Sequence, residues 1–159
     1  MVLDNGQMGI HIGEKSLILG LDPGRDKVGF AFVTCSGELI SSGIFPTSER
    51  DKFFTGEDSS IANYVIEGSS SVSLSDVKFI ALGNGTSSKN FYEYVKNKVM
   101  CKIIIVNEKN STLDARKLYW KIHKPGFFAR ILPESLRVPK RILDDLAAWE
   151  ISLRALNQI

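Results

Sequence analysis

The stretch that decides the fold is SLILGLDPGRDKVGFAFV, which runs from Ser16 to Val33. Residues 17–21 form a continuous apolar run, the pattern of a strand that is buried on both faces. A second run, rich in Val, Phe and Ala, covers residues 28–34. Asp22 follows the first run directly and is itself followed by a proline and a glycine. An ordinary turn explains Asp-Pro-Gly as well as a functional carboxylate does, because all three residue types favour turns. The rest of the chain has to decide between them.

The segments that follow predict a meander of strands and then an alternation of strands and helices. Residues 38–45 (ELISSGIF) predict a third strand that Pro46 ends. The remaining apolar patterns predict strands at 77–82 and 102–106 and helices at 59–67, 88–99, 111–123 and from 140 to the end. Ser111 and Asp114 fit a capping box, which places the start of the third helix. The serine-rich residues 68–75 predict a flexible connector, and residues 124–139, with three prolines, predict an irregular loop.

These patterns predict an α/β fold in one domain. The expected core is a five-stranded mixed sheet, with an antiparallel meander followed by parallel strands and with helices on its flanks. The chain of 159 residues is long enough for one domain with a real core and short for two. We therefore expect an N-terminal tail over residues 1–16 and a single domain over residues 17–159.

Charge is distributed unevenly along the chain. The 20 Lys and Arg residues exceed the 18 Asp and Glu residues by only two, so net charge alone does not indicate a nucleic-acid partner. Residues 109–141, however, hold nine Lys or Arg against two acids, so this segment carries about +7 and the remainder about −5. The segment is either a solvated helix face or a nucleic-acid groove, and Phe127 and Phe128 within it are suited to base stacking.

Cysteine usage and hydropathy bear on the compartment. Cys35 and Cys101 show no metal-ligand spacing, and each lies in or beside a predicted strand, so we expect two reduced thiols in the core. The N-terminus lacks a basic start with a continuous apolar run, and no stretch approaches the roughly 20 apolar residues of a membrane span. The sequence thus predicts a soluble cytoplasmic protein without a membrane partner.

Four carboxylates fall at related places in the predicted fold. Asp22 ends the first strand, Glu108 lies just beyond the fifth, and Asp144 and Asp145 lie one turn into the last helix. The carboxyl ends of parallel strands share one edge of a sheet, where ligands bind. Carboxylates that converge there repel one another unless cations neutralise them, and oxygen ligands favour Mg²⁺ or Mn²⁺. Such ions can activate an attacking water and stabilise the leaving oxygen of a phosphodiester, which is nuclease chemistry.

Each acid also has a structural explanation. Asp22 can form a turn, Glu108 can be a solvated loop charge, and the two acids near the start of the last helix can complement its dipole. Taken one at a time, the residues leave these alternatives open.

Three segments together resemble a known family. ILGLDPGRDKVGFAFV, VNEKNSTLDARKLYW and DDLAAW are similar to the YqgF and RuvC branch of the ribonuclease H-like superfamily, most nearly to the YqgF-type Holliday junction resolvases. The resemblance runs from about residue 17 to the C-terminus. It implies a ribonuclease H-like fold in which Asp22, Glu108 and Asp144 are the catalytic, metal-binding acids, with Asp145 as a shifted match for the third. It further implies a metal-dependent endonuclease that acts on RNA or branched DNA as a monomer or homodimer, in ribosomal RNA precursor processing or in Holliday junction resolution.

The sequence departs from the family pattern at two places. The segment ALGNGTSSKNF after the fourth strand has no acid where RuvC-like resolvases carry a Glu, and Asn107 replaces the Asp that typically precedes the second motif's Glu. GNGTSS instead resembles the corresponding turn in the YqgF-like domain of the Tex transcription factors. This turn could bind phosphate through helix-start amides and the side chains of Asn84, Thr86, Ser87 and Ser88, or it could simply cap a helix.

The expected contacts to nucleic acid follow from the basic segment, the GNGTSS turn and the turn after the first strand. They are Arg25, Asn84, Thr86, Ser87, Lys109, Arg116, Lys121, Arg130, Arg137 and Lys140. Two other functions stay open. One is a noncatalytic nucleic-acid-binding module like the Tex domain, with vestigial acids. The other is a nucleotide-binding fragment of the actin-like ATPases, which need a duplicated domain that this chain is too short to hold.

Overall fold

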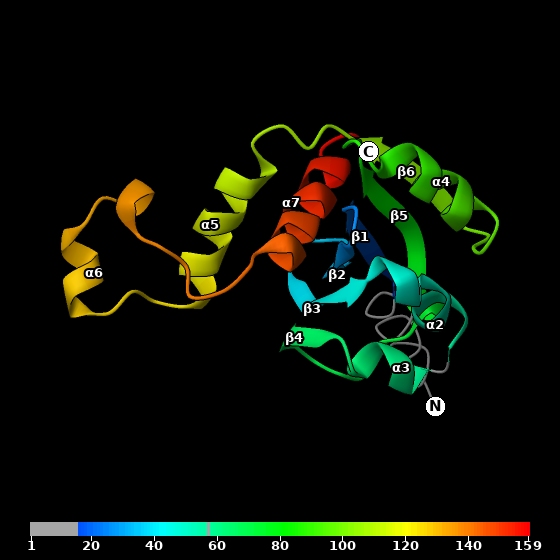
Figure 1. Cartoon of the computed structure of the whole chain (residues 1–159), viewed down its shortest axis with the longest axis horizontal. Helices are drawn as coiled ribbons and strands as arrows, with labels where there is room; N and C mark the ends of the chain where they lie inside the picture. The colour runs from blue at the N-terminus through cyan, green and yellow to red at the C-terminus, as the bar shows by residue number, and fades with distance from the viewer. Residues whose placement is uncertain (1–15, 57) are drawn as a thin grey trace, which may run out of the picture.

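A six-stranded mixed sheet forms the centre of the molecule. The computed structural model describes residues 16–56 and 58–159, and the strands run in the order β4-β3-β2-β1-β5-β6 (Figure 1). β1 to β4 pair with antiparallel neighbours, whereas β5 and β6 run parallel to β1. The strands are β1 (Leu17–Pro23), β2 (Lys27–Thr34), β3 (Leu39–Pro46), β4 (Val65–Gly68), β5 (Val77–Gly83) and β6 (Lys102–Val106). The predicted mixed α/β fold is confirmed, with one strand more than expected. Residues 1–15 of the predicted tail, which covers residues 1–16, lie outside the described residues.

Helices cover both faces of the sheet. They are α2 (Arg50–Thr55), α3 (Asp58–Ala62), α4 (Ser88–Lys96), α5 (Ser111–Ile122), α6 (Phe127–Ile131) and α7 (Asp144–Leu156). Short 3₁₀ turns occur at η1 (Thr47–Glu49), η2 (Leu74–Asp76) and η3 (Glu134–Leu136). Leu19 and Leu21 of β1 belong to the cluster that packs against α2, α3 and α4, whereas Ile18 belongs to the cluster with α7. This alternation follows from the two-residue period of a strand, so β1 is buried on both sides.

Two glycines let α7 lie directly on the central strands. A Cβ atom at Gly20 would lie 2.1 Å from the carbonyl oxygen of Ala148, and one at Gly29 would lie 2.0 Å from that of Asp144. Any side chain at either position would push the helix away from the sheet. The first turn of α7, which carries Asp144, is therefore seated against β2 beside the end of β1.

Several predicted boundaries are wrong. The helix expected at 59–67 is split into α3 and the edge strand β4, because residues 65–68 pair with the free edge of β3. This long-range pairing outweighs the helical spacing on which the prediction depended. The sequence pattern did not reveal α2, α6 lies inside the segment expected to be an irregular loop, and α7 begins at Asp144 rather than at Lys140.

The start of α5 is confirmed, but its predicted capping box is wrong. Ser111 is the first helical residue and Asn110 is the N-cap, with a left-handed φ of 64° and no side-chain capping bond. Asp114 instead accepts a hydrogen bond from Arg154 of α7, with Nη2 2.7 Å from Oδ2. A contact between helices thus replaces the local cap.

The cysteine prediction is partly wrong. Both thiols are free, but Cys35 lies exposed in the turn after β2, and Cys101 is only half-buried before β6. Cys35 belongs to the turn between β2 and β3 rather than to a buried strand position. In the part of the chain that the structure describes, no helix has the length and apolar character needed to cross a membrane.

Candidate active site

The ends of β1, β5 and β6 place two predicted acids at one edge of the sheet. Leu21 of β1 pairs with Leu82 of β5, and Gly83 at the end of β5 pairs with Val106 of β6. Asp22 is the next residue of β1, and Glu108 follows β6 by two residues. The parallel strand ends therefore bring the first and second predicted acids together, as expected.

The loop after β5 positions Glu108. The backbone N–H of Asn84 donates to the carbonyl of Val106 at 3.0 Å, and the N–H of Glu108 donates to Asn84 Oδ1 at 3.1 Å. A Cβ at Gly83 would lie 2.5 Å from Glu108 Oε2, and a Cβ at Gly85 would lie 2.0 Å from Oε1. The glycines of the GNGTSS turn thus make room for a carboxylate of the same chain. Asn84, predicted to contact phosphate, uses its side-chain oxygen to orient this carboxylate.

The environment of Asp22 has a large effect on its ionisation. Burial and the negative charges of Glu108 and Asp144 raise the pKa of Asp22 from 3.8 to about 7. Desolvation is the largest cause, followed by repulsion from Glu108 and then from Asp144. All three predicted acids are therefore close enough to interact. The surroundings of Asp22 therefore favour its protonated form.

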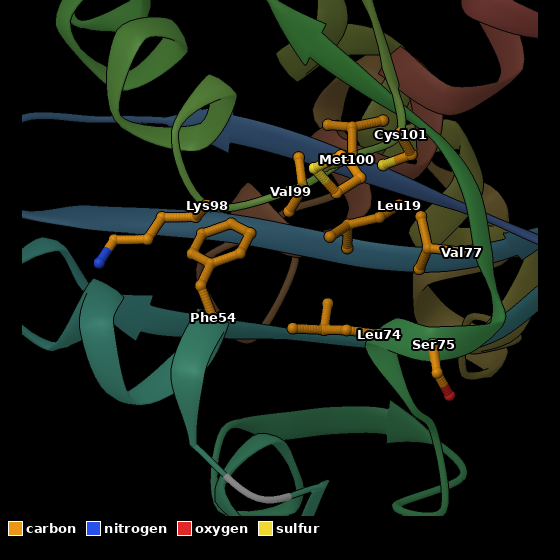
Figure 2. A pocket seen from close by; sticks show the side chains of 10 residues that line it. Leu19, Phe54, Leu74, Ser75, Val77, Lys98, Val99, Met100 and Cys101 are labelled. Atoms are coloured by element: carbon orange, nitrogen blue, oxygen red, sulfur yellow. The ribbon is translucent and has the colours of Figure 1, made fainter.

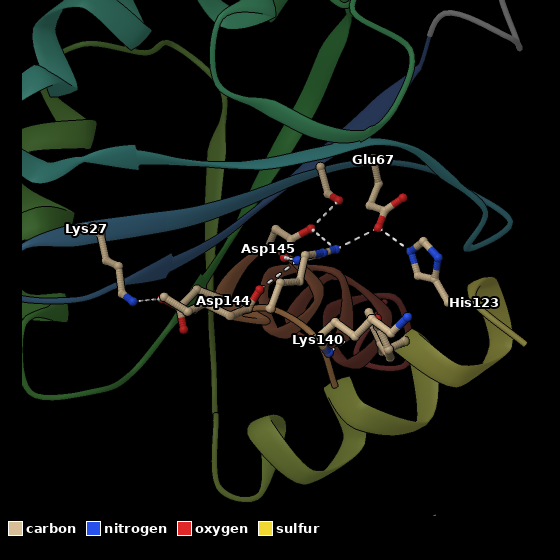
Figure 3. A network of polar contacts seen from close by, with 10 residues as sticks. Lys27, Glu67, His123, Lys140, Asp144 and Asp145 are labelled. Atoms are coloured by element: carbon tan, nitrogen blue, oxygen red, sulfur yellow. Dashed lines mark hydrogen bonds and ion pairs between the residues drawn. The ribbon is translucent and has the colours of Figure 1, made fainter. Parts of the chain in front are cut away.

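Asp144 is paired with a cation from a neighbouring strand. Lys27, the first residue of β2, places its Nζ 3.1 Å from Asp144 Oδ2, as Figure 3 shows. The Lys27 and Asp144 side chains are 43% and 32% exposed, so both remain accessible to solvent. Nothing in the sequence pattern indicated that Lys27 belongs to the site, because its partner is 117 residues away.

Asp145, the fourth predicted acid, has partners other than the three acids at the edge of the sheet. Its carboxylate is completely buried and accepts hydrogen bonds from Arg141 and from Ser42 Oγ, the latter at 2.7 Å. Arg141 also donates to Glu67 of β4 at 2.8 Å, and His123 contacts the same Glu67 oxygen (Figure 3). Ser42 lies in β3, and Arg141 links Asp145 to Glu67 in β4, so these hydrogen bonds anchor α7 to the sheet.

The donor atoms of the acids are of the type that a hard cation prefers, but the side chains are not spaced to hold one in this structure. All the donors are carboxylate oxygens, and Glu108 Oε2 is buried with no hydrogen-bond partner among the described residues. Nevertheless, within residues 16–56 and 58–159 no group of three or more His, Cys, Asp or Glu side chains is arranged to hold a metal ion. Asp22 and Glu108 provide the adjacent pair, while Asp144 is bound to Lys27.

Arg154 of α7 braces the loop that carries Glu108. Its Nη1 donates to the carbonyls of Asn107 and Lys109, each at 2.8 Å, on either side of Glu108. Glu150 and Asp114 in turn accept hydrogen bonds from the same guanidinium at 3.0 and 2.7 Å. Sequence reasoning missed this residue, because the exposed face of a helix would explain an arginine equally well.

The predicted nucleic-acid contacts fall into two groups. Arg25 and Lys109 are exposed near the acid edge, and exposed Arg116 lines a pocket of about 280 Å³ that also includes Asp144 and Arg141. Exposed Thr86 and half-buried Ser87 lie in the GNGTSS turn, where Ser87 makes no side-chain capping bond. The Ser87 side chain therefore does not cap α4, as the structural explanation of this turn would require.

The second group lies on an arm, which we define as residues 124–142. Figure 1 shows α6 at the tip of the arm, on the far side of α5 from the sheet. Lys121 at the base of the arm, and Arg130 and Lys140 within it, are exposed, as are the rings of Phe127 and Phe128. Arg137 differs from this prediction: its Nε donates to the carbonyls of Ala129 and Leu132 at 2.8 and 3.1 Å, so it holds the arm together.

Another pocket lies away from the acids. Figure 2 shows a pocket of about 500 Å³ near the start of β5, lined by side chains that include Leu19, Phe54, Val77 and Met100. Its lining is mostly apolar and contains none of the predicted acids. The acid edge is therefore distinguished from this pocket by its charges.

Comparison with known proteins assigns no family. No protein-family model matches the chain, and no curated protein matches it. Among solved structures, it is similar to a candidate sugar kinase from Cytophaga hutchinsonii ATCC 33406, with 18% sequence identity and a TM-score of 0.36. The match covers 63% of this chain and 38% of that protein. A likeness this low assigns neither a fold family nor a function.

Proposed function

We propose that this chain is a metal-dependent endonuclease with a ribonuclease H-like fold, acting on structured nucleic acid. The observation that carries the proposal is the convergence of carboxyls at one edge of the sheet: Asp22 and Glu108 lie at or just beyond the ends of parallel strands. Burial and the nearby charges of Glu108 and Asp144 raise the pKa of Asp22 to about 7. Strongly perturbed carboxyls that face like charges are typical of functional sites. The strand order also supports the proposal, because β1, β5 and β6 are parallel neighbours and their carboxyl ends lie at one edge of the sheet.

The proposed roles follow from the positions of the side chains. Asp22, Glu108 and Asp144 would hold Mg²⁺ or Mn²⁺, and such an ion lowers the pKa of an attacking water and stabilises a leaving oxygen. A bound cation would favour the ionised form of Asp22, because of its added positive charge. The glycines of the GNGTSS turn and Arg154 keep Glu108 in place. Arg25, Lys109 and Arg116 supply positive charge for phosphates beside the acids.

A second function, a noncatalytic nucleic-acid-binding module, is favoured by a different observation. Lys27 already neutralises Asp144, and no acid follows β5 where the resolvase pattern requires one. A site whose charges are balanced within the protein can hold phosphate without a metal ion. Cleavage separates the two functions.

The deciding experiment combines binding and cleavage. Labelled RNA hairpins, DNA duplexes and four-way junctions are titrated with the wild type and with Asp22→Asn, in Mg²⁺, in Mn²⁺ and in EDTA. Asp26→Asn is the matched control, since Asp26 is an exposed carboxylate in the turn that follows Asp22. Metal-dependent cleavage that Asp22→Asn loses and Asp26→Asn keeps supports the nuclease. Binding without cleavage favours the module, and failure to bind any of the substrates overturns both.

A further inference from the structure

We infer that the Lys27 ammonium is the resident cation of the acid edge: it neutralises Asp144 in the metal-free protein and gives way when a divalent ion binds. The displacement part rests on the proposed metal site. The neutralisation part rests on the ion pair alone.

The backbone around Lys27 fixes its starting point. The carbonyl of Lys27 accepts a hydrogen bond from Gly24 N–H at 2.9 Å, which closes the turn between β1 and β2. Gly29, two residues further along β2, points to the same face as Lys27 and allows the Asp144 backbone to approach. Lys27 therefore begins beside the first turn of α7, and its side chain needs only to extend for Nζ to reach Asp144 at 3.1 Å.

Stability does not explain this ion pair. Pairs between partly exposed side chains contribute little to the free energy of unfolding, and often nothing measurable. The anchoring of α7 is already provided by the neighbouring Asp145, which is completely buried and held by Arg141 and Ser42. The Lys27 pair is consequently free to exchange partners.

Charge balance does explain it. Three carboxyls lie at one edge of the sheet, those of Asp22, Glu108 and Asp144. Lys27 forms an ion pair with Asp144. A lysine ammonium is a compact charge on a flexible stem, so it can occupy a carboxylate and later release it. While it is in place it lowers the negative potential that a nucleic-acid phosphate would meet. Once displaced, it remains on β2 beside the site.

Two measurable consequences follow for Lys27→Met, which removes the charge and keeps a flexible apolar stem. The variant should bind Mn²⁺ about three- to tenfold more tightly than the wild type, because no ammonium competes for Asp144. In EDTA it should bind a labelled RNA hairpin or four-way junction several-fold more weakly, because the acids are then unbalanced. Mn²⁺ should restore that binding.

Calorimetric titration with Mn²⁺ and fluorescence anisotropy in EDTA test both consequences. Lys52→Met is the matched control, since Lys52 also forms an exposed ion pair, 3.4 Å from Glu49, on another part of the surface. Its Mn²⁺ and nucleic-acid affinities should equal those of the wild type.

The outcomes separate the inference from the proposed function. Equal Mn²⁺ affinity in the wild type and Lys27→Met, with binding lost in Asp22→Asn, overturns the role of Lys27 and leaves the metal site standing. Absence of Mn²⁺ binding in both proteins overturns the metal site and the displacement together. Unchanged nucleic-acid binding by Lys27→Met in EDTA overturns the neutralisation.

Discussion

Arg141 binds both oxygens of Asp145, with Nη1 2.7 Å from Oδ1 and Nη2 3.1 Å from Oδ2. The preceding residue, Asp144, is paired with Lys27 instead. Successive residues of a helix point about 100° apart, so two neighbouring acids meet different surroundings. Asp145 faces the buried side of α7, and Asp144 faces the strand ends.

The two acids should therefore differ in their effect on stability. Asp145→Asn removes one charge of a buried pair and leaves Arg141 poorly compensated, so we expect it to lower the free energy of unfolding by roughly 3 kcal/mol. Asp144→Asn should change it by less than about 1 kcal/mol, since its ion pair is partly exposed. Urea unfolding of both variants measures the difference. Equal losses would contradict the anchoring role of Asp145.

Asp22 should make the metal-free protein less stable as pH rises. Its pKa is about 7 in the folded state and near 3.8 in the unfolded chain, so between these values the folded state binds the extra proton. Stability therefore falls as pH increases from about 4 to about 7, and the full loss is present above that range. Asp22→Asn lacks this loss and should be more stable than the wild type at pH 8 by about 1 to 3 kcal/mol. Thermal melts in EDTA at pH 4 and pH 8 test this, and a difference between the two proteins that does not change with pH would contradict it.

Gly85→Ala should disturb Glu108 with little effect on the core. The added Cβ would lie 2.0 Å from Glu108 Oε1, so the carboxylate has to move. We expect the melting temperature in EDTA to change by only a few degrees. The increase in melting temperature on adding Mn²⁺ should be largely lost, because the ion stabilises the folded protein only by binding to it. Gly126→Ala is the control, because a Cβ there meets nothing within 4 Å. A full Mn²⁺-induced shift in Gly85→Ala would show that Glu108 is not a ligand.

Arg154 should act on Glu108 through the loop rather than by contact with a ligand. Arg154→Gln loses the hydrogen bonds to the carbonyls of Asn107 and Lys109, so we expect about tenfold weaker Mn²⁺ binding. Arg154→Lys keeps a charge that can reach the same carbonyls and should recover part of the affinity. Equal Mn²⁺ affinity in the wild type and Arg154→Gln would remove the positioning role.

The exposed cations of the arm and its base should contribute to nucleic-acid binding through phosphates. Replacement of Lys121, Arg130 and Lys140 by Ala should weaken binding to all sequences and reduce the salt dependence, by a slope of about 0.7 to 0.9 for each phosphate that the variant no longer neutralises. The control replaces Lys78, Lys96 and Lys102, two of which lie at the starts of β5 and β6, away from the acid edge. If the salt dependence of binding is the same in the arm variant and the wild type, the nucleic acid binds to another surface.

Local patterns were sufficient to predict the strands that carry the site. The apolar runs at residues 17–21, 28–34, 77–82 and 102–106 all correspond to strands, because a short continuous apolar run is a strong local signal. β1 and β2 are buried on both faces, whereas β6 lies at the edge of the sheet and is only partly buried. From these strands, the proximity of Asp22 and Glu108 followed directly. β4 could not be predicted in the same way, since its four residues become a strand only by pairing with β3.

The partners of the acids could not be predicted, because Lys27 is distant in sequence from Asp144, and the four-residue spacing of Arg141 and Asp145 does not show which way that pair faces. Lys27, Arg141 and Arg154 are surface-type residues whose roles depend on which helix face meets which strand. Asp144 and Asp145 likewise present the same local pattern, and only the orientation of α7 distinguishes them. Residue type identified the kind of chemistry, whereas tertiary packing determined which residues take part in it.

The packing of α7 on the central strands has a consequence for biosynthesis. Ser42 and Asp145, which join β3 to α7, are 103 residues apart, and Trp149 reaches back 112 residues to the Gly37 carbonyl. During translation the strands emerge long before the helix that covers them, so one apolar face of the sheet stays uncovered until α7 has been made. Asp144 arrives on that same helix. The nascent chain therefore gains Asp144 only when α7 covers the sheet. The same late step covers the apolar face, which protects it from aggregation, and completes the set of three acids.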